Sequence, residues 1–184
     1  MKQDPNNYWE QLERLEKLIK ASELKAGVVF SFHGLILGLF IDRLEQLRPI
    51  FLEGRVFIIL TLLWIISVLI SIFFCFKCFK PRIELKYDKN VFFFRDAVNA
   101  FGSIQEYTKR LLEVVANEEE LFTQLSQQIH VESKIIDHKF KSVQNAIKYF
   151  GLSIIIAIII ITNKDKIVGI THPGTAGTLP SPPA

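Results

Sequence analysis

The patterns that usually mark an enzyme are missing from this sequence of 184 residues. It contains no Ser/His/Asp set, no P-loop and no dinucleotide-binding glycine motif. The longest stretch without a candidate membrane span, residues 77–148, has only about 72 residues, which is too short for most catalytic folds and leaves little core of its own. We therefore expect a protein that is not an enzyme.

An excess of one charge is also missing, and cysteine is scarce. The 22 Lys and Arg residues nearly balance the 19 Asp and Glu residues, and the formal net charge of +3 does not indicate nucleic acid as a partner. The two cysteines, Cys75 and Cys78, form a Cys-x-x-Cys motif. A metal site would need two more ligands and a redox motif would need a βαβ unit, and the sequence offers neither. We therefore expect no metal and no bound cofactor.

Apolar residues, in contrast, make up 49% of the chain, and many of them gather in runs without charge. At about 1.5 Å per residue, a helix over residues 56–76 spans about 31 Å, close to the hydrocarbon thickness of a bilayer. Residues 26–41 and 149–163 give shorter runs of about 16 and 15 residues, which span about 24 Å or less. We expect three transmembrane helices; the alternative is two, with a short run forming a buried core helix.

The distribution of Lys and Arg predicts the orientation of these spans. Four of them lie between residues 14 and 25, before the first run, and five lie between residues 77 and 89, directly after the second. The loop at residues 42–55 has three, and three lie shortly before the third run against two after it. We therefore expect the N-terminus and residues 77–148 inside the cell and the C-terminus outside.

The sequence thus predicts an all-α membrane protein, with a two-span N-terminal hairpin, a cytoplasmic helical module and a long helix that continues into a third span. In chain order the expected parts are a cytoplasmic N-terminal helix (1–25), transmembrane helix 1 (26–41), an outer loop (42–55), transmembrane helix 2 (56–76), the cytoplasmic helical module (77–148), transmembrane helix 3 (149–163) and a disordered outer tail (164–184).

Local signals place several helix boundaries within this layout. Asp4-Pro5-Asn6 is typical of a helix start, and Ser103-Ile104-Gln105-Glu106 has the pattern of a capping box. Asn117, followed by three glutamates, predicts the start of a helix of about 40 residues that enters the third span. Residues 83–87 and 91–94 are compatible either with a short β-hairpin or with a plain linker.

Small residues recur on one side of the first span and again on the second. Gly34 and Gly38 form a Gly-x-x-x-Gly motif, a pattern that lets helix backbones approach closely in lipid. The full set of expected packing residues is Gly27, Ser31, Gly34, Gly38, Ser67 and Ser71. The serines offer a matching face within the hairpin, and self-association of the glycine face is the alternative. His33 lies beside Gly34, where it is either a functional group or a neutral side chain bonded to a neighbouring helix.

Several short motifs occur together in an order and spacing that resemble a known family, the Pycsar transmembrane effectors. They are Glu23-Leu24-Lys25-Ala26-Gly27, His33-Gly34, Phe93-Phe94-Arg95-Asp96, Glu106-Tyr107, Gln128-Ile129, Lys134-Ile135 and Lys139-Phe140. The resemblance covers roughly residues 20–162. The sequence departs from the family pattern at Glu23, where Asp is expected, and at Arg95, where a small residue is common.

This resemblance implies a role in bacterial antiphage defence. In that family a pyrimidine nucleotide cyclase, activated by phage, makes cCMP or cUMP, and a multi-pass effector in the inner membrane responds. Membrane integrity is then impaired and the infected cell stops growing. The resemblance makes residues 77–148 the sensor module, the cyclic pyrimidine nucleotide the activating ligand, membrane lipid a partner and the active form a homo-oligomer. The alternatives are a non-enzymatic membrane scaffold and a ligand-independent, holin-like pore.

Candidate ligand-binding residues follow from the chemistry of such a nucleotide. Its phosphate requires Arg or Lys, and its base requires an aromatic or polar partner. The expected contacts are Arg95, Tyr107, Lys134 and Lys139, with ordinary surface side chains as the alternative for each.

Overall fold

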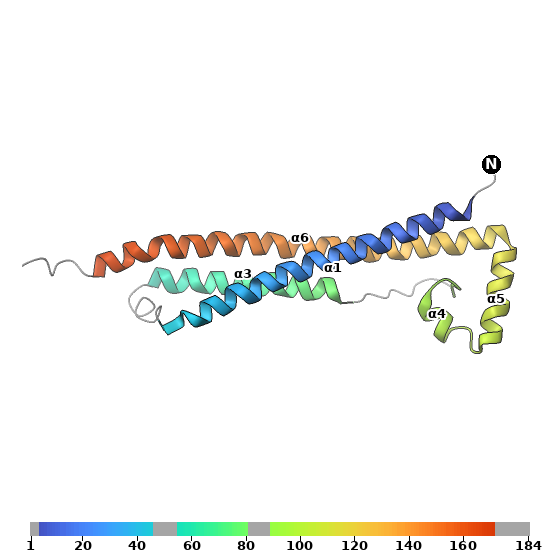
Figure 1. Cartoon of the computed structure of the whole chain (residues 1–184), viewed down its shortest axis with the longest axis horizontal. Coiled ribbons are helices and arrows are strands. Elements are labelled where there is room, and N and C mark those ends of the chain that lie inside the picture. Colours follow the sequence, from blue (N-terminus) through green and yellow to red (C-terminus); the bar gives the residue numbers. More distant parts are fainter. Residues whose placement is uncertain (1–3, 46–54, 81–88, 172–184) are drawn as a thin grey trace, which may run out of the picture. The chain divides into compact units, whose positions relative to one another are not determined.

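The structure, a computed structural model, describes residues 4–45, 55–80 and 89–171, and side chains as far as residue 163. All regular elements in these ranges are helices: α1 (Pro5–Asp42), α3 (Arg55–Phe79), α4 (Phe94–Asn99), α5 (Ile104–Ala116) and α6 (Glu118–Thr171) (Figure 1). The chain divides into two compact units. Unit 1 comprises residues 1–28 and 74–145, and unit 2 comprises residues 29–73 and 146–184.

Three of the described helices, α1, α3 and α6, are long and apolar enough to cross a membrane. Their most apolar stretches have mean hydropathies of 1.9, 2.9 and 2.0, respectively. The prediction of an all-α membrane protein with three apolar helices is thereby confirmed at the level of length and composition.

The predicted helix starts are confirmed, because each is determined by neighbouring residues. The Asp4 carboxylate accepts a hydrogen bond from the Asn6 backbone N–H (2.9 Å) at the start of α1. At α5, Ser103 and Glu106 form the reciprocal capping box. At α6, the Asn117 side chain accepts hydrogen bonds from the backbone N–H groups of the second and third helical residues, at 3.1 and 3.3 Å.

Two segments differ from the sequence prediction. The β-hairpin does not form, because residues 91–93 make a turn and Phe94 begins α4; residues 83–87 lie outside the described part of the chain. Helix α6 has 54 residues and runs to Thr171, whereas the sequence predicted a helix of about 40 residues and a disordered tail from residue 164; residues 172–184 lie outside the described part of the chain. No proline interrupts the helix before that point, so the polar residues after 162 do not end it.

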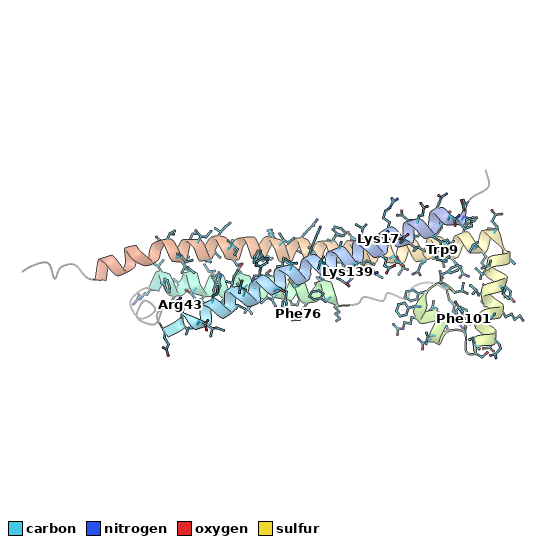
Figure 2. All side chains as sticks on the ribbon, viewed as in Figure 1. Trp9, Lys17, Arg43, Phe76, Phe101 and Lys139 are labelled. Carbon is cyan, nitrogen blue, oxygen red and sulfur yellow. The ribbon has the colours of Figure 1, made fainter. Side chains whose placement is uncertain are left out.

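In unit 1, small buried side chains allow three helices to meet. Ala26 of α1, Cys78 of α3 and Val143 of α6 form the buried apolar cluster, and the Cys78 thiol lies 3.8 Å from the Ser22 carbonyl oxygen. Towards the N-terminus of α1, aromatic rings continue the packing: the Trp9 ring meets the Phe92 ring edge-on, with centroids 5.4 Å apart (Figure 2 labels Trp9).

Polar side chains attach the turn at residues 89–93 to the rest of unit 1. The Asn90 side-chain amide donates to the Gln124 backbone carbonyl (2.8 Å), and the Gln124 side chain accepts a hydrogen bond from the Val91 N–H (2.9 Å). The Tyr107 hydroxyl donates to the Val91 carbonyl (3.2 Å). The last two bonds satisfy the backbone N–H and carbonyl of the buried Val91, which lies outside the helices.

In unit 2, side-chain hydroxyls bond directly to a neighbouring backbone. Ser67 and Ser71 of α3 donate to the carbonyl oxygens of Tyr149 and Ala146 on α6, at 3.0 and 2.8 Å. Many large apolar side chains of this unit are exposed, among them Leu35 at 61%. Outward-facing apolar surface of this kind is what a helix presents to lipid.

Candidate functional site

The buried Lys139 side chain of α6 bonds to both other long helices of unit 1. Its ammonium group donates to the Glu23 carboxylate of α1 (2.7 Å) and to the Cys78 carbonyl oxygen of α3 (2.7 Å). Figure 2 labels Lys139 on α6. The Cys78 carbonyl belongs to the last turn of α3, where unpaired carbonyls carry partial negative charge. One cation therefore holds three helices of unit 1 together.

The two partners of this ion pair differ in their access to water. The Lys139 side chain is 8% exposed, whereas the Glu23 side chain is 40% exposed. A buried ammonium is costly unless it is paired, so Lys139 depends on its two oxygen partners. Glu23 can exchange Lys139 for water at much lower cost. The ion pair can therefore open when Glu23 turns to water, provided that another anion takes its place beside Lys139.

The four expected ligand-binding residues lie on three different helices of unit 1. Arg95 lies on α4 and is exposed, and Lys134 lies on α6 and is exposed. The half-buried Tyr107 bonds to Val91, and the buried Lys139 bonds to Glu23 and Cys78. No hydrogen bond or ring contact within the described residues joins Tyr107 to Lys139. Lys139 is engaged with both other long helices of unit 1, through Glu23 of α1 and the Cys78 carbonyl of α3.

The expected packing residues fall into two groups. Gly34, Gly38 and Ser31 are exposed, and a Cβ atom added at either of these glycines would meet nothing within 4 Å. Gly27 is half-buried, and an added Cβ would lie 3.9 Å from the Phe79 ring. The second group, Ser67 and Ser71, is buried and contacts the backbone of α6.

The serines of α3 therefore do not serve as the matching face for the glycines of the first span. In the described residues of unit 2 the Gly-x-x-x-Gly face of α1 is open, and it remains available for another chain or for lipid.

His33 is fully buried in unit 2, and neither of its ring nitrogens has a hydrogen-bond partner in the described structure. Its ring packs edge-on against Phe150 of α6, with centroids 5.0 Å apart. The hydrogen bond to a neighbouring helix that the sequence left open is therefore not formed. The side chain is held by aromatic packing instead.

Glu132 of α6 is a second polar side chain with an incomplete set of partners. The Gln128 amide donates to one carboxylate oxygen (3.0 Å), while the other oxygen is buried without a partner in the described residues. Burial raises the pKa of Glu132 above its ordinary value, and the nearby Glu16 carboxylate of α1 adds to this increase, whereas the bond from Gln128 opposes it. Ionised Glu132 is thus a local cost to the packing of unit 1.

Sequence reasoning missed the partners of Lys139. Glu23 is 116 residues away from Lys139 in the chain, and no local pattern links two side chains over that distance. Glu23 appeared only as a departure from the family motif, and the carbonyl of Cys78 leaves no trace in a side-chain pattern. An indirect signal in the sequence is spacing: Lys139 lies three residues after Ile136 and four before Val143, so it shares a helix face with two apolar residues.

Comparison with known proteins places this arrangement in a family. A family model described as the Pycsar effector protein domain matches residues 7–162, a range that includes the apolar stretches of α1, α3 and α6. Searches of curated proteins and of solved structures give no match. The match covers most of the chain, from the first turn of α1 to the end of the apolar part of α6. The chain therefore belongs to the Pycsar effector family of transmembrane type, and it is a membrane effector of antiphage defence.

Proposed function

We propose that this protein is an inner-membrane effector that responds to a cyclic pyrimidine nucleotide, cCMP or cUMP, and then impairs the integrity of the membrane. A partner pyrimidine nucleotide cyclase supplies the ligand. The infected cell stops growing before phage can mature. Family membership supports the defence role, and the helices themselves support a mechanism that needs no catalysis.

The observation that carries this proposal is the continuity of α1 and α6. Helix α6 holds Lys139 in unit 1 and then runs without interruption through the apolar stretch that follows residue 148. Helix α1 likewise holds Glu23 and continues to Asp42. A ligand that prefers one arrangement of the polar residues shifts the population of the whole helix, because a helix is a stiff element.

The orientation proposed for this mechanism has the N-terminus and residues 77–148 in the cytoplasm, where the nucleotide is made. The supporting feature is the excess of Lys and Arg in the segments before the first apolar run and after the second. Lys77 and Lys80 at the end of α3 belong to this excess. The active form is proposed to be a homo-oligomer in which the open Gly34 and Gly38 face of α1 meets a second copy.

The decisive experiment compares cells that express the chain with an active cyclase, with an inactive cyclase variant, and without a cyclase. We expect growth arrest and uptake of a membrane-impermeant dye only with the active cyclase. Damage in all three cultures would favour a ligand-independent, holin-like pore. Absence of damage in all three cultures, at confirmed membrane expression, would favour a scaffold and overturn the proposal.

A further inference from the structure

A small hollow in unit 1 lies beside Lys139, between the end of α3 and the polar part of α6. Its lining residues are Lys77, Lys80, Ile135, His138, Lys139 and Ser142. All six belong to unit 1, and the lining contains no acidic side chain. Three ammonium groups and an imidazole surround one opening, so the hollow is basic.

The charges in this hollow are unequally compensated. Lys139 is neutralised by Glu23, but Lys77 and Lys80 pair with no carboxylate in the described part of the chain. The Lys77 ammonium lies over the ring of Phe74, 5.7 Å from its centroid, which leaves its hydrogen-bonding capacity free. Both lysines are exposed, so an anion can reach them from solvent. Such a concentration of cations attracts anions and holds them by charge-assisted hydrogen bonds.

The hollow lies at the end of the apolar part of α3, and this position favours anions found at a membrane surface. Lys77 follows directly after the apolar run that ends at residue 76, and the neighbouring Phe76 and Phe79 are exposed. The cations therefore lie where apolar helix surface gives way to polar surface, which is the depth of lipid phosphates in a bilayer. The anionic group of a ligand bound here would lie among the lysines, and the rest of the ligand would extend out of the hollow.

From these features we infer that the hollow is a binding site for a phosphodiester. Two ligands carry that group: an anionic phospholipid, and the cyclic pyrimidine nucleotide, whose relevance rests on the proposed function above. A phosphodiester between Lys77 and Lys80 also lies next to the Lys139 ammonium, for which it competes with the solvent-accessible Glu23. Binding therefore weakens the contact that holds α1 to α6 in unit 1.

The experiment measures binding to the purified full-length chain with each source of the phosphodiester separately. One arm titrates cCMP and cUMP into the protein in detergent. The other compares retention of phosphatidylglycerol and phosphatidylcholine by native mass spectrometry. The test variant is Lys77→Gln/Lys80→Gln, and both changes are at exposed positions that leave the core intact.

The matched control is Lys20→Gln/Lys141→Gln, which removes the same charge from unit 1 at exposed lysines outside the hollow. We expect the test variant to bind the phosphodiester at least about tenfold more weakly, because two charge-assisted contacts are lost. The control should bind like the wild type.

The two binding measurements together show whether the hollow binds a phosphodiester and which of the two ligands supplies it. Weakened nucleotide binding assigns the hollow to the nucleotide, and weakened phosphatidylglycerol retention with unchanged nucleotide binding assigns it to lipid. Equal binding by the test variant and the wild type in both arms, or an equal loss in the control, overturns the inference. Failure of the proposed function is seen elsewhere, as absence of cyclase-dependent growth arrest in cells that express the wild-type chain.

Discussion

The asymmetry of the Lys139–Glu23 pair predicts that removing the carboxylate costs more than removing the ammonium. In Glu23→Gln the ammonium stays buried beside a neutral amide and the Cys78 carbonyl, and breaking a buried pair in this way costs about 3 kcal/mol. In Lys139→Met the charge is removed and the stem volume is kept, while the 40% exposed Glu23 regains water. Only the modest gain of a partly exposed pair is lost, about 1 kcal/mol.

Thermal unfolding in detergent, followed by tryptophan fluorescence, tests this ordering. At about 2–4 °C per kcal/mol for a chain of this size, Lys139→Met should lower the midpoint by about 2–4 °C and Glu23→Gln by about 6–12 °C. The double variant Glu23→Gln/Lys139→Met should return close to Lys139→Met alone, because no buried charge is left. Lys141→Met, whose lysine is 67% exposed, is the control and should change little. Equal losses in the two single variants, or an additive double variant, would refute this reasoning.

Three further predictions use other parts of the molecule. Gly34→Leu should abolish cyclase-dependent growth arrest and chemical crosslinking between copies. It should leave the thermal unfolding midpoint unchanged, because an added side chain at this position meets open space within the chain. A lowered midpoint would show that this face packs inside the chain. Glu132→Gln should raise the midpoint at pH 7.5, and the gain should shrink as the pH falls through the raised pKa of the folded state; a gain independent of pH would contradict the assigned cause. A topology reporter fused after Lys80 should report a cytoplasmic position, and one fused after Gly169 a periplasmic position. If both report the same side, the apolar part of α6 does not cross the membrane.

The sign of the Glu132 effect follows from proton linkage. Because its pKa is raised in the folded chain, the folded state holds this proton more tightly than the unfolded state does. The cost is present when the carboxyl is ionised, above the folded pKa, and it disappears once both states are protonated. Glutamine is neutral at every pH and removes that cost. The Glu16 carboxylate, which contributes to the raised pKa, is itself paired with Lys20 at 2.6 Å.

Much of the fold could be predicted from the sequence because its determinants are local. The starts of α1, α5 and α6 follow from capping residues within three positions of each boundary, and the apolar runs follow from composition. The continuation of α6 to Thr171 was missed, because polar residues were taken to end the span. Polarity ends a span in lipid, but it does not end a helix.

The candidate site was less predictable because it depends on helix rotation. An apolar stretch that is hydrophobic on all sides gives no period from which to choose the buried face. The pattern therefore could not show that Ser67 and Ser71 face α6 while Gly34 and Gly38 stay open. The pairing of Lys139 with Glu23 has the same origin, since it depends on how three helices of unit 1 are rotated against one another.

The magnitude of the Lys139 contact bears on why the active form is proposed to be an oligomer. Coupling between a ligand and a conformational change is typically about 1–3 kcal/mol, and the pair's worth of about 1 kcal/mol lies at the lower end of this range. Moving a two-state equilibrium from 1:99 to 99:1 requires about 5.5 kcal/mol. One chain with one ligand therefore falls short of a decisive switch. If copies meet through the open glycine face of α1 and change together, the contributions of two or more chains add and the threshold is reached. Growth arrest should then rise more steeply than linearly with nucleotide concentration, and Gly34→Leu should remove that steepness before it removes nucleotide binding.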